Sequence, residues 1–222
     1  HTEGIRNIRS IARTLNRSVG ILLDLQGPKI RVGRLENGEP VRLKRNAAFA
    51  ITSTPMAGTA QMVSTTYQNL HSDVQPGDTI LLDDGLIRLL VESKTRDTVN
   101  CKVIHGGWLK ENKGINLPGV NVSAPSLTDK DVRDVNFGIK NGVDYFALSF
   151  VRRAEDLEAI KSIMKKQGVA IPVIAKIEKP EAVENLDEIL DVADGIMVAR
   201  GDLGVEMQLE LVPIIQKKII SA

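Results

Sequence analysis

Polar side chains follow several short apolar runs of this sequence, at the positions where buried strands would end. In a parallel β/α sheet or barrel, ligands bind at the carboxyl ends of the strands. If the runs are parallel strands, we therefore expect any chemistry to lie at these positions. The side chains concerned are those of Asp24, Ser149, Lys176, Glu178 and Asp202.

Lys176 and Glu178 stand two residues apart in Ala-Lys-Ile-Glu, so on a strand they point to the same face. An ammonium and a carboxylate on one face form either a structural ion pair inside a barrel or part of a catalytic site. Such a pair taken alone favours the structural interpretation, and its position at the end of a strand shifts the balance toward catalysis.

Asp202 follows Ala199-Arg200-Gly201 and begins a turn or a helix. It is either a helix N-cap, a position that Asp fills well, or a second carboxylate for a hard metal ion. In the second case Glu178 and Asp202 would hold Mg²⁺ or Mn²⁺, with water and substrate oxygens completing the coordination. The three histidines and one cysteine are too scattered to form a zinc cluster.

Other charged residues are located in turns and loops, and none of them indicates a catalytic or binding role when it is considered alone. Arg31 follows Gly-Pro-Lys-Ile, Asp84 belongs to the turn Asp-Asp-Gly, and Lys113 precedes a glycine in a loop. We expect Cys101 to be a small buried strand residue and Trp108 to pack.

The pattern of apolar residues and turn signals changes twice along the sequence, and these changes divide the chain into three segments. Residues 1–28 contain a helical pattern over 4–16 and an apolar run over 19–23 that predicts a buried strand. Residues 29–125 hold short strand-like runs separated by turn signals, which predicts a small all-β barrel. Residues 126–222 alternate single helices with strands at intervals of about 20 to 30 residues, the rhythm of parallel β/α units.

The composition indicates a globular protein without special affinity for polyanions or lipid. Of 222 residues, 42% are hydrophobic and 26% are charged, and 29 basic against 28 acidic residues give a net charge of +1. The lack of a basic block, with only 3% aromatic residues, argues against a nucleic-acid partner, and no apolar run reaches membrane-spanning length. A single cysteine excludes an internal disulfide and fits a reducing cytoplasm.

Several segments, in the same order and with the same spacing, resemble the pyruvate kinase family across nearly the whole chain. They are Asp-Leu-Gln-Gly-Pro-Lys-Ile-Arg (24–31), Asp-Asp-Gly-Leu-Ile (83–87), Lys-Gly-Ile-Asn-Leu-Pro-Gly (113–119), Ala-Leu-Ser-Phe-Val-Arg (147–152), Val-Ile-Ala-Lys-Ile-Glu-Lys (173–179) and Asp-Gly-Ile-Met-Val-Ala-Arg-Gly-Asp-Leu-Gly-Val-Glu (194–206).

The resemblance implies an α/β fold: part of a TIM-type (β/α)8 barrel, about strands 3 to 6, with a small all-β barrel inserted as a mobile lid. Residues 1–28 and 126–222 would belong to the barrel, and residues 29–125 to the lid. It also implies a cytoplasmic, allosteric homotetramer of glycolysis. Such an enzyme transfers the phosphoryl group of phosphoenolpyruvate to ADP, giving pyruvate and ATP, with no nucleic-acid or membrane partner.

The resemblance also implies roles for the residues at the strand ends. Lys176 matches the lysine that stabilises the phosphoryl group during transfer, and Arg31 matches an arginine on the substrate phosphate. Glu178 and Asp202 match the ligands of Mg²⁺ or Mn²⁺. The positions that match the rest of the substrate pocket are Ser149, Phe150, Ala199, Arg200, Gly201 and Asp202.

In the predicted lid, Asp84 and Lys113 match residues that close over the nucleotide and its metal ion. Asp24 matches a ligand of the family's monovalent cation. Members that use K⁺ commonly have Thr-Lys where this chain has Leu25-Gln26, and Glu where it has Lys29. A lysine at this position is associated with potassium-independent members, because its ammonium supplies the same unit charge. We therefore expect K⁺ not to be required.

Two other interpretations stay open on the sequence alone. One is a metal-dependent lyase of the phosphoenolpyruvate/pyruvate barrel type, which would not need an insert carrying Asp84 and Lys113. The other is a truncated, inactive module of a kinase. The chain starts without Met and both ends read as helix, so we expect a fragment that is inactive by itself.

Overall fold

The computed structural model describes residues 1–222, which form two compact units. Unit 1 comprises His1–Pro28, Pro125–Leu203 and Pro213–Ala222, and unit 2 comprises Lys29–Ala124 and Gly204–Val212. The assignment of Gly204–Val212 to unit 2 differs from the division expected from the sequence, in which all of 126–222 belonged to the barrel. The pattern of residues in the sequence cannot reveal this difference, because residues 204–212 are largely helical like the residues on either side.

Unit 1 contains a parallel four-stranded sheet with the order β1-β10-β11-β12. Its strands are β1 (Leu22–Leu25), β10 (Tyr145–Leu148), β11 (Val173–Ile177) and β12 (Gly195–Val198). Because a closed (β/α)8 barrel has eight such strands, this curled sheet corresponds to half of one. The parallel register brings the carboxyl ends of all these strands to one edge.

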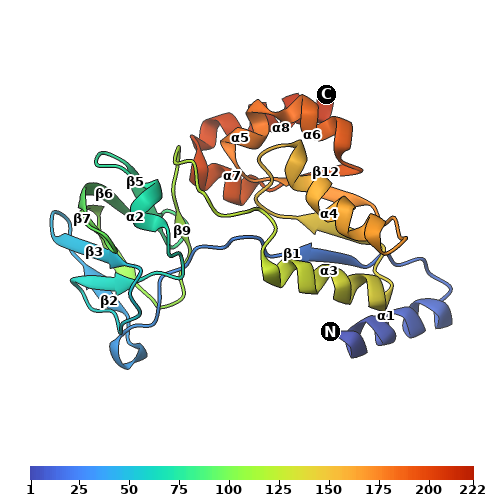
Figure 1. Ribbon diagram of the computed structural model, residues 1–222, viewed down its shortest axis with the longest axis horizontal. Coiled ribbons are helices and arrows are strands. Elements are labelled where there is room, and N and C mark those ends of the chain that lie inside the picture. The colour runs from blue at the N-terminus through green and yellow to red at the C-terminus, as the bar shows by residue number, and fades with distance from the viewer. The chain divides into compact units, whose positions relative to one another are not determined.

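Helices connect the strands of unit 1 and pack on the sheet: α4 contacts β11, and α3 contacts β1, as Figure 1 shows. The shared core is apolar and includes Leu25, Phe146, Leu148 and Ile177. The helices are α1 (Thr2–Thr14), α3 (Asp129–Asn141), α4 (Ala154–Lys166), α5 (Pro180–Glu184), α6 (Leu186–Val192), α7 (Arg200–Glu206), which crosses the boundary between the units, and α8 (Val212–Ser221).

Unit 2 is built mainly of short strands around its own core. A six-stranded sheet has the order β4-β3-β7-β6-β5-β9, and β2 pairs with β8. The elements are η1 (Glu36–Gly38), β2 (Val41–Leu43), β3 (Ala48–Thr52), β4 (Met62–Ser64), α2 (Leu70–Asp73), β5 (Thr79–Leu82), β6 (Ile87–Lys94), β7 (Thr98–His105), β8 (Gly107–Leu109), β9 (Ile115–Asn116) and η2 (Leu209–Leu211).

Two local expectations from the sequence need correction. The strand expected over 19–23 is present, but it begins only at Leu22, which is 37% exposed at the edge of the sheet. Trp108 does not pack into the core: its side chain is 59% exposed on β8, and the guanidinium of Arg42 lies 5.8 Å from its ring centroid. Neighbouring residues of a strand point to opposite faces, and the buried side chain is that of Leu109.

Cys101 is buried, as the sequence predicts. None of the helices combines the length and the apolar character needed to span a membrane.

Candidate active site

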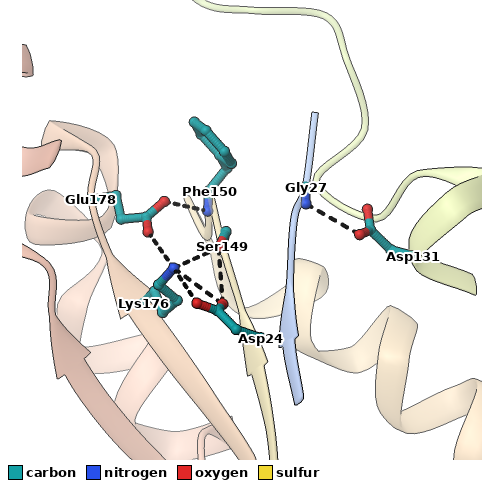
Figure 2. A network of polar contacts seen from close by, with 7 residues as sticks. All are labelled: Asp24, Gly27, Asp131, Ser149, Phe150, Lys176 and Glu178. Atoms are coloured by element: carbon teal, nitrogen blue, oxygen red, sulfur yellow. Dashed lines mark hydrogen bonds and ion pairs between the residues drawn. The ribbon is translucent and has the colours of Figure 1, made fainter. Parts of the chain in front are cut away.

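Four side chains of unit 1 form what we call the strand-end cluster: Asp24, Ser149, Lys176 and Glu178. Asp24 belongs to β1, Lys176 belongs to β11, and Ser149 and Glu178 directly follow β10 and β11. Figure 2 shows these side chains converging at the carboxyl edge of the sheet. The prediction that polar residues gather there is therefore matched by the geometry of these four.

The ammonium of Lys176 is the centre of the cluster. Its Nζ donates to Ser149 Oγ at 2.8 Å and lies 3.1 and 3.2 Å from the two carboxylate oxygens of Asp24. It also lies 3.0 Å from Glu178 Oε1. The expected same-face pairing of Lys176 and Glu178 is present, and Asp24 is a second anionic partner that the sequence did not reveal.

Glu178 is nearly fully buried, with 4% of its side chain exposed. Its second oxygen, Oε2, accepts a hydrogen bond from the backbone N–H of Phe150 at 3.0 Å. Phe150 adopts a φ of 56°, which is rare for a bulky residue and must be maintained by its surroundings. The unusual backbone of Phe150 thus provides one of the groups that hold Glu178.

Burial and charge act in opposite directions on the ion pair. Burial works to lower the pKa of Lys176, but the hydrogen bonds and charges of Glu178 and Asp24 outweigh it, so this pKa is raised. Burial raises the pKa of Glu178, against the effects of the Phe150 N–H and Lys176, and the negative charge of Asp202 adds to the rise.

The raised pKa of Lys176 favours its charged form, whereas the raised pKa of Glu178 favours its neutral form. The ion pair itself stabilises both charges, so burial must account for the difference. The exposed fractions agree with this explanation, since the Lys176 side chain is 13% exposed and that of Glu178 only 4%. The ion pair is the principal polar contact between the two side chains, and burial is the reason that the pKa of Glu178 is raised in spite of it.

Glu178 and Asp202 have the chemistry of a site for a hard cation. Asp202 lies in the first turn of α7, after β12, and its negative charge contributes to the raised pKa of Glu178. A divalent cation bound by both carboxylates would offset this repulsion and the burial of Glu178. The structure gathers no group of three or more potential His, Cys, Asp or Glu ligands. Mg²⁺ needs no such group, because it often binds one or two carboxylates together with water and substrate phosphates.

Three further candidates of unit 1, Ala199, Arg200 and Gly201, lie between the end of β12 and the first turn of α7. Ala199 follows β12, and its N–H donates to Ile177 O at 3.2 Å. Arg200 and Gly201 are exposed at the start of α7. These positions follow the carboxyl end of β12, as expected from the sequence.

Three further candidates belong to unit 2: Arg31, Asp84 and Lys113. Arg31 forms a β-bridge with Gly114 and donates from its guanidinium to Asn112 O at 2.6 Å. The ammonium of Lys113 lies 2.9 Å from Asp83 Oδ1, so its ionic partner is the neighbour of Asp84. The sequence analysis does not single out Asp83, and the signal that could have identified it is the adjacent pair of aspartates.

Lys29 also belongs to unit 2, whereas Asp24 belongs to unit 1. Within unit 1, the cation that faces the Asp24 carboxylate is Lys176.

Comparison with known proteins assigns the family. The family model for the pyruvate kinase barrel domain matches residues 1–222. The chain belongs to the pyruvate kinase family. It is 48% identical over 220 residues to a pyruvate kinase of Corynebacterium glutamicum, covering 99% of this chain and 46% of the relative. It is 50% identical over 226 residues to pyruvate kinase 2 of Synechocystis, covering 100% of this chain and 38% of the relative.

A solved structure agrees with this assignment. The crystal structure of a pyruvate kinase from Cryptosporidium parvum superimposes with a TM-score of 0.91 at 40% sequence identity, over 98% of this chain and 46% of that one. The resemblance to the pyruvate kinase family inferred from the sequence is thereby confirmed. The chain spans less than half the length of these relatives.

Proposed function

We propose that the complete protein transfers the phosphoryl group of phosphoenolpyruvate to ADP, giving pyruvate and ATP. Membership of the pyruvate kinase family supports this proposal. The observation that carries it is the strand-end cluster, in which a partly buried ammonium lies between two carboxylates at the carboxyl edge of a parallel sheet. Such a site places an ammonium beside carboxylates that can hold a divalent cation, at the edge where ligands of β/α barrels bind.

The proposed reaction requires charge neutralisation more than covalent help from the protein. The bond between phosphorus and the enol oxygen breaks, and its electron pair stays on that oxygen. A terminal oxygen of ADP forms the new bond to phosphorus, and the enolate then takes up a proton to give pyruvate. Lys176 and Arg31 are proposed to neutralise oxygens of the phosphoryl group during transfer, as preorganised cations can.

The other residues receive roles that the family resemblance supports. Asp84 and Lys113 are proposed to contact the nucleotide and its metal ion, as part of a unit 2 that acts as a lid. A lid that excludes water would strengthen the electrostatic contacts of the reaction. The proposed substrate pocket includes Ser149, Phe150, Ala199, Arg200, Gly201 and Asp202.

Glu178 and Asp202 are the proposed ligands of Mg²⁺ or Mn²⁺. Such an ion supplies positive charge that stabilises oxygen anions of the substrate as the transfer proceeds. Glu178 also stays bound to the Phe150 N–H through its second oxygen, which fixes the direction of its carboxylate.

We further propose that the protein does not require K⁺. The support is the sequence Leu25-Gln26 with Lys29, where members that use the ion commonly have Thr-Lys and Glu. An ammonium supplies a unit positive charge without an ion to recruit, whereas a carboxylate would favour a bound cation. Asp24, the proposed match to a monovalent-cation ligand, already has the ammonium of Lys176 as a partner.

A cytoplasmic homotetramer with allosteric control belongs to the same proposal. Its support is the family resemblance and, for the reducing compartment, a single buried cysteine that forms no disulfide.

The test is ATP formation by the complete protein from phosphoenolpyruvate, ADP and Mg²⁺, followed with a luciferase-coupled assay. We expect stoichiometric formation of ATP and pyruvate. Consumption of phosphoenolpyruvate without ATP would instead indicate a metal-dependent lyase. If neither substrate is consumed by folded protein, the proposed function is wrong.

A further inference from the structure

Asp131 is a fully buried carboxylate of unit 1 that lies outside the strand-end cluster. It is located in the first turn of α3, where it forms a capping box with the N-cap residue Thr128. Its Oδ2 accepts from the backbone N–H of Thr128 at 2.9 Å and from the Thr128 hydroxyl at 2.5 Å. These bonds are enough to explain an aspartate at this position of a helix.

The other oxygen of Asp131 has a partner far away in the sequence. Asp131 Oδ1 accepts a buried hydrogen bond from the backbone N–H of Gly27 at 3.2 Å, 104 residues from it in the chain (Figure 2). Helix α4 offers an internal comparison, because Asp156 occupies the equivalent position there. The Asp156 carboxylate accepts hydrogen bonds from the nearby backbone N–H groups of Arg152 and Arg153. Asp131 therefore accepts one hydrogen bond, from Gly27, that capping of the helix does not require.

Gly27 in turn lies against Phe150. Gly27 has a φ of 65°, and a Cβ at this position would be only 2.7 Å from Cδ2 of the Phe150 ring. The ring therefore occupies the space that any side chain at position 27 would need. The bond to Asp131 fixes the backbone on which this ring rests.

Phe150 completes the connection to the cluster. Its backbone, held at a φ of 56°, directs its N–H to Glu178 Oε2 at 3.0 Å. A residue in this sparsely populated region keeps its conformation only when its neighbours determine it. The contacts thus run from the Asp131 carboxylate through Gly27 and the Phe150 ring to the carboxylate of Glu178.

We propose that Asp131 is a positioning residue of the active site, which fixes Gly27 and Phe150 and through them the direction of the Glu178 carboxylate. Partners that orient a metal ligand commonly change metal affinity or activity by about 10- to 100-fold when they are removed. Asp131 acts through two intermediates, so we expect an effect of about tenfold, at the lower end of this range. For its activity readout, this inference rests on the proposed function.

The test compares Asp131→Asn with Thr128→Ala in the complete protein. Asn keeps the shape of Asp131 but has one acceptor oxygen, so it cannot serve both Gly27 and Thr128. Thr128→Ala removes the cap side chain and leaves the bond to Gly27 in place, which makes it the control for loss of capping. The affinity for Mn²⁺ alone is measured by electron paramagnetic resonance of the free ion, and kcat is measured with saturating substrates.

We expect Asp131→Asn to weaken Mn²⁺ binding and to lower kcat by about tenfold each, and Thr128→Ala to change neither. Hydrogen exchange of the Gly27 amide should accelerate only in Asp131→Asn. If the two variants behave alike in all three measurements, Asp131 merely caps α3 and the inference is wrong.

Gly27→Ala provides an independent variant in case Asp131→Asn does not fold. Its Cβ would displace the Phe150 ring without touching the cap of α3. We expect the same loss of Mn²⁺ affinity, and unchanged affinity would overturn the inference. If the wild-type protein makes no ATP but the Mn²⁺ affinities follow this pattern, the positioning role stands and the proposed function falls.

Discussion

Replacing Lys176 by Met should destabilise the protein, because it removes the ammonium but leaves its buried partner. Glu178 would lose the contact at 3.0 Å and keep only the Phe150 N–H, with Asp202 still adding negative charge nearby. Breaking a buried pair in this way costs about 3–5 kcal/mol. We expect about 3 kcal/mol, the lower end of that range, because Glu178 can take up a proton.

The double variant Lys176→Met/Glu178→Gln should recover much of this loss, because no buried charge is then left without a partner. Lys161→Met is the matched control. Lys161 forms a comparable pair with Asp194 at 2.9 Å, but the two side chains are 34% and 40% exposed. Removing an exposed pair should cost at most about 1 kcal/mol.

The assay is thermal unfolding of the complete proteins at several pH values. The pKa of Glu178 is raised by burial, so its protonation favours the folded state. Stability from this group is present below its unfolded pKa and is lost as the pH rises through the raised folded value. The deficit of Lys176→Met should therefore be largest near neutral pH and shrink as the pH falls toward about 4. Equal unfolding temperatures for Lys176→Met and wild type, or a double variant less stable than the single one, would show that the ammonium of Lys176 does not stabilise the buried Glu178 carboxylate.

Four further outcomes are expected. Glu178→Gln should weaken Mn²⁺ binding by more than about tenfold in a direct titration, and unchanged affinity would exclude Glu178 as a ligand. The wild-type complete protein should be fully active in a tetraalkylammonium buffer without Na⁺ or K⁺, and Lys29→Glu should become dependent on K⁺; strong activation of the wild type by K⁺ would contradict this. The 222-residue chain alone should make little or no ATP, because its parallel sheet has only four strands; turnover near that of the complete protein would contradict this. Burial, with a smaller effect from Glu92, raises the pKa of the Cys101 thiol to about 12, so iodoacetamide at pH 8 should modify it only after unfolding.

The sequence predicted the parts of the site that depend on local geometry. Lys176 and Glu178 share a face because side chains alternate along a strand, and their contact needs no knowledge of the rest of the fold. Parallel strands also bring their carboxyl ends together, which explains why Asp24 and Ser149 could be expected near them.

The parts that escaped prediction depend on pairing between distant segments. The contact of Lys176 with Asp24 joins residues 152 positions apart and follows from the order of the strands in the sheet. The bond of Asp131 to Gly27 likewise requires the packing of α3 beside β1. Trp108 was misjudged because an aromatic residue on a short strand can face either way until the register is known.

The rate of phosphoryl transfer without the Lys176 ammonium tests its proposed role most directly. Complete wild-type protein and the Lys176→Met variant would each be loaded with phosphoenolpyruvate and Mg²⁺, mixed with ADP, and quenched within milliseconds to seconds. We expect ATP formation in the first turnover to slow by about 10²- to 10³-fold in the variant, because one preorganised charge is removed. A first turnover as fast as that of the wild type, in a folded variant, would contradict the central role of this ammonium.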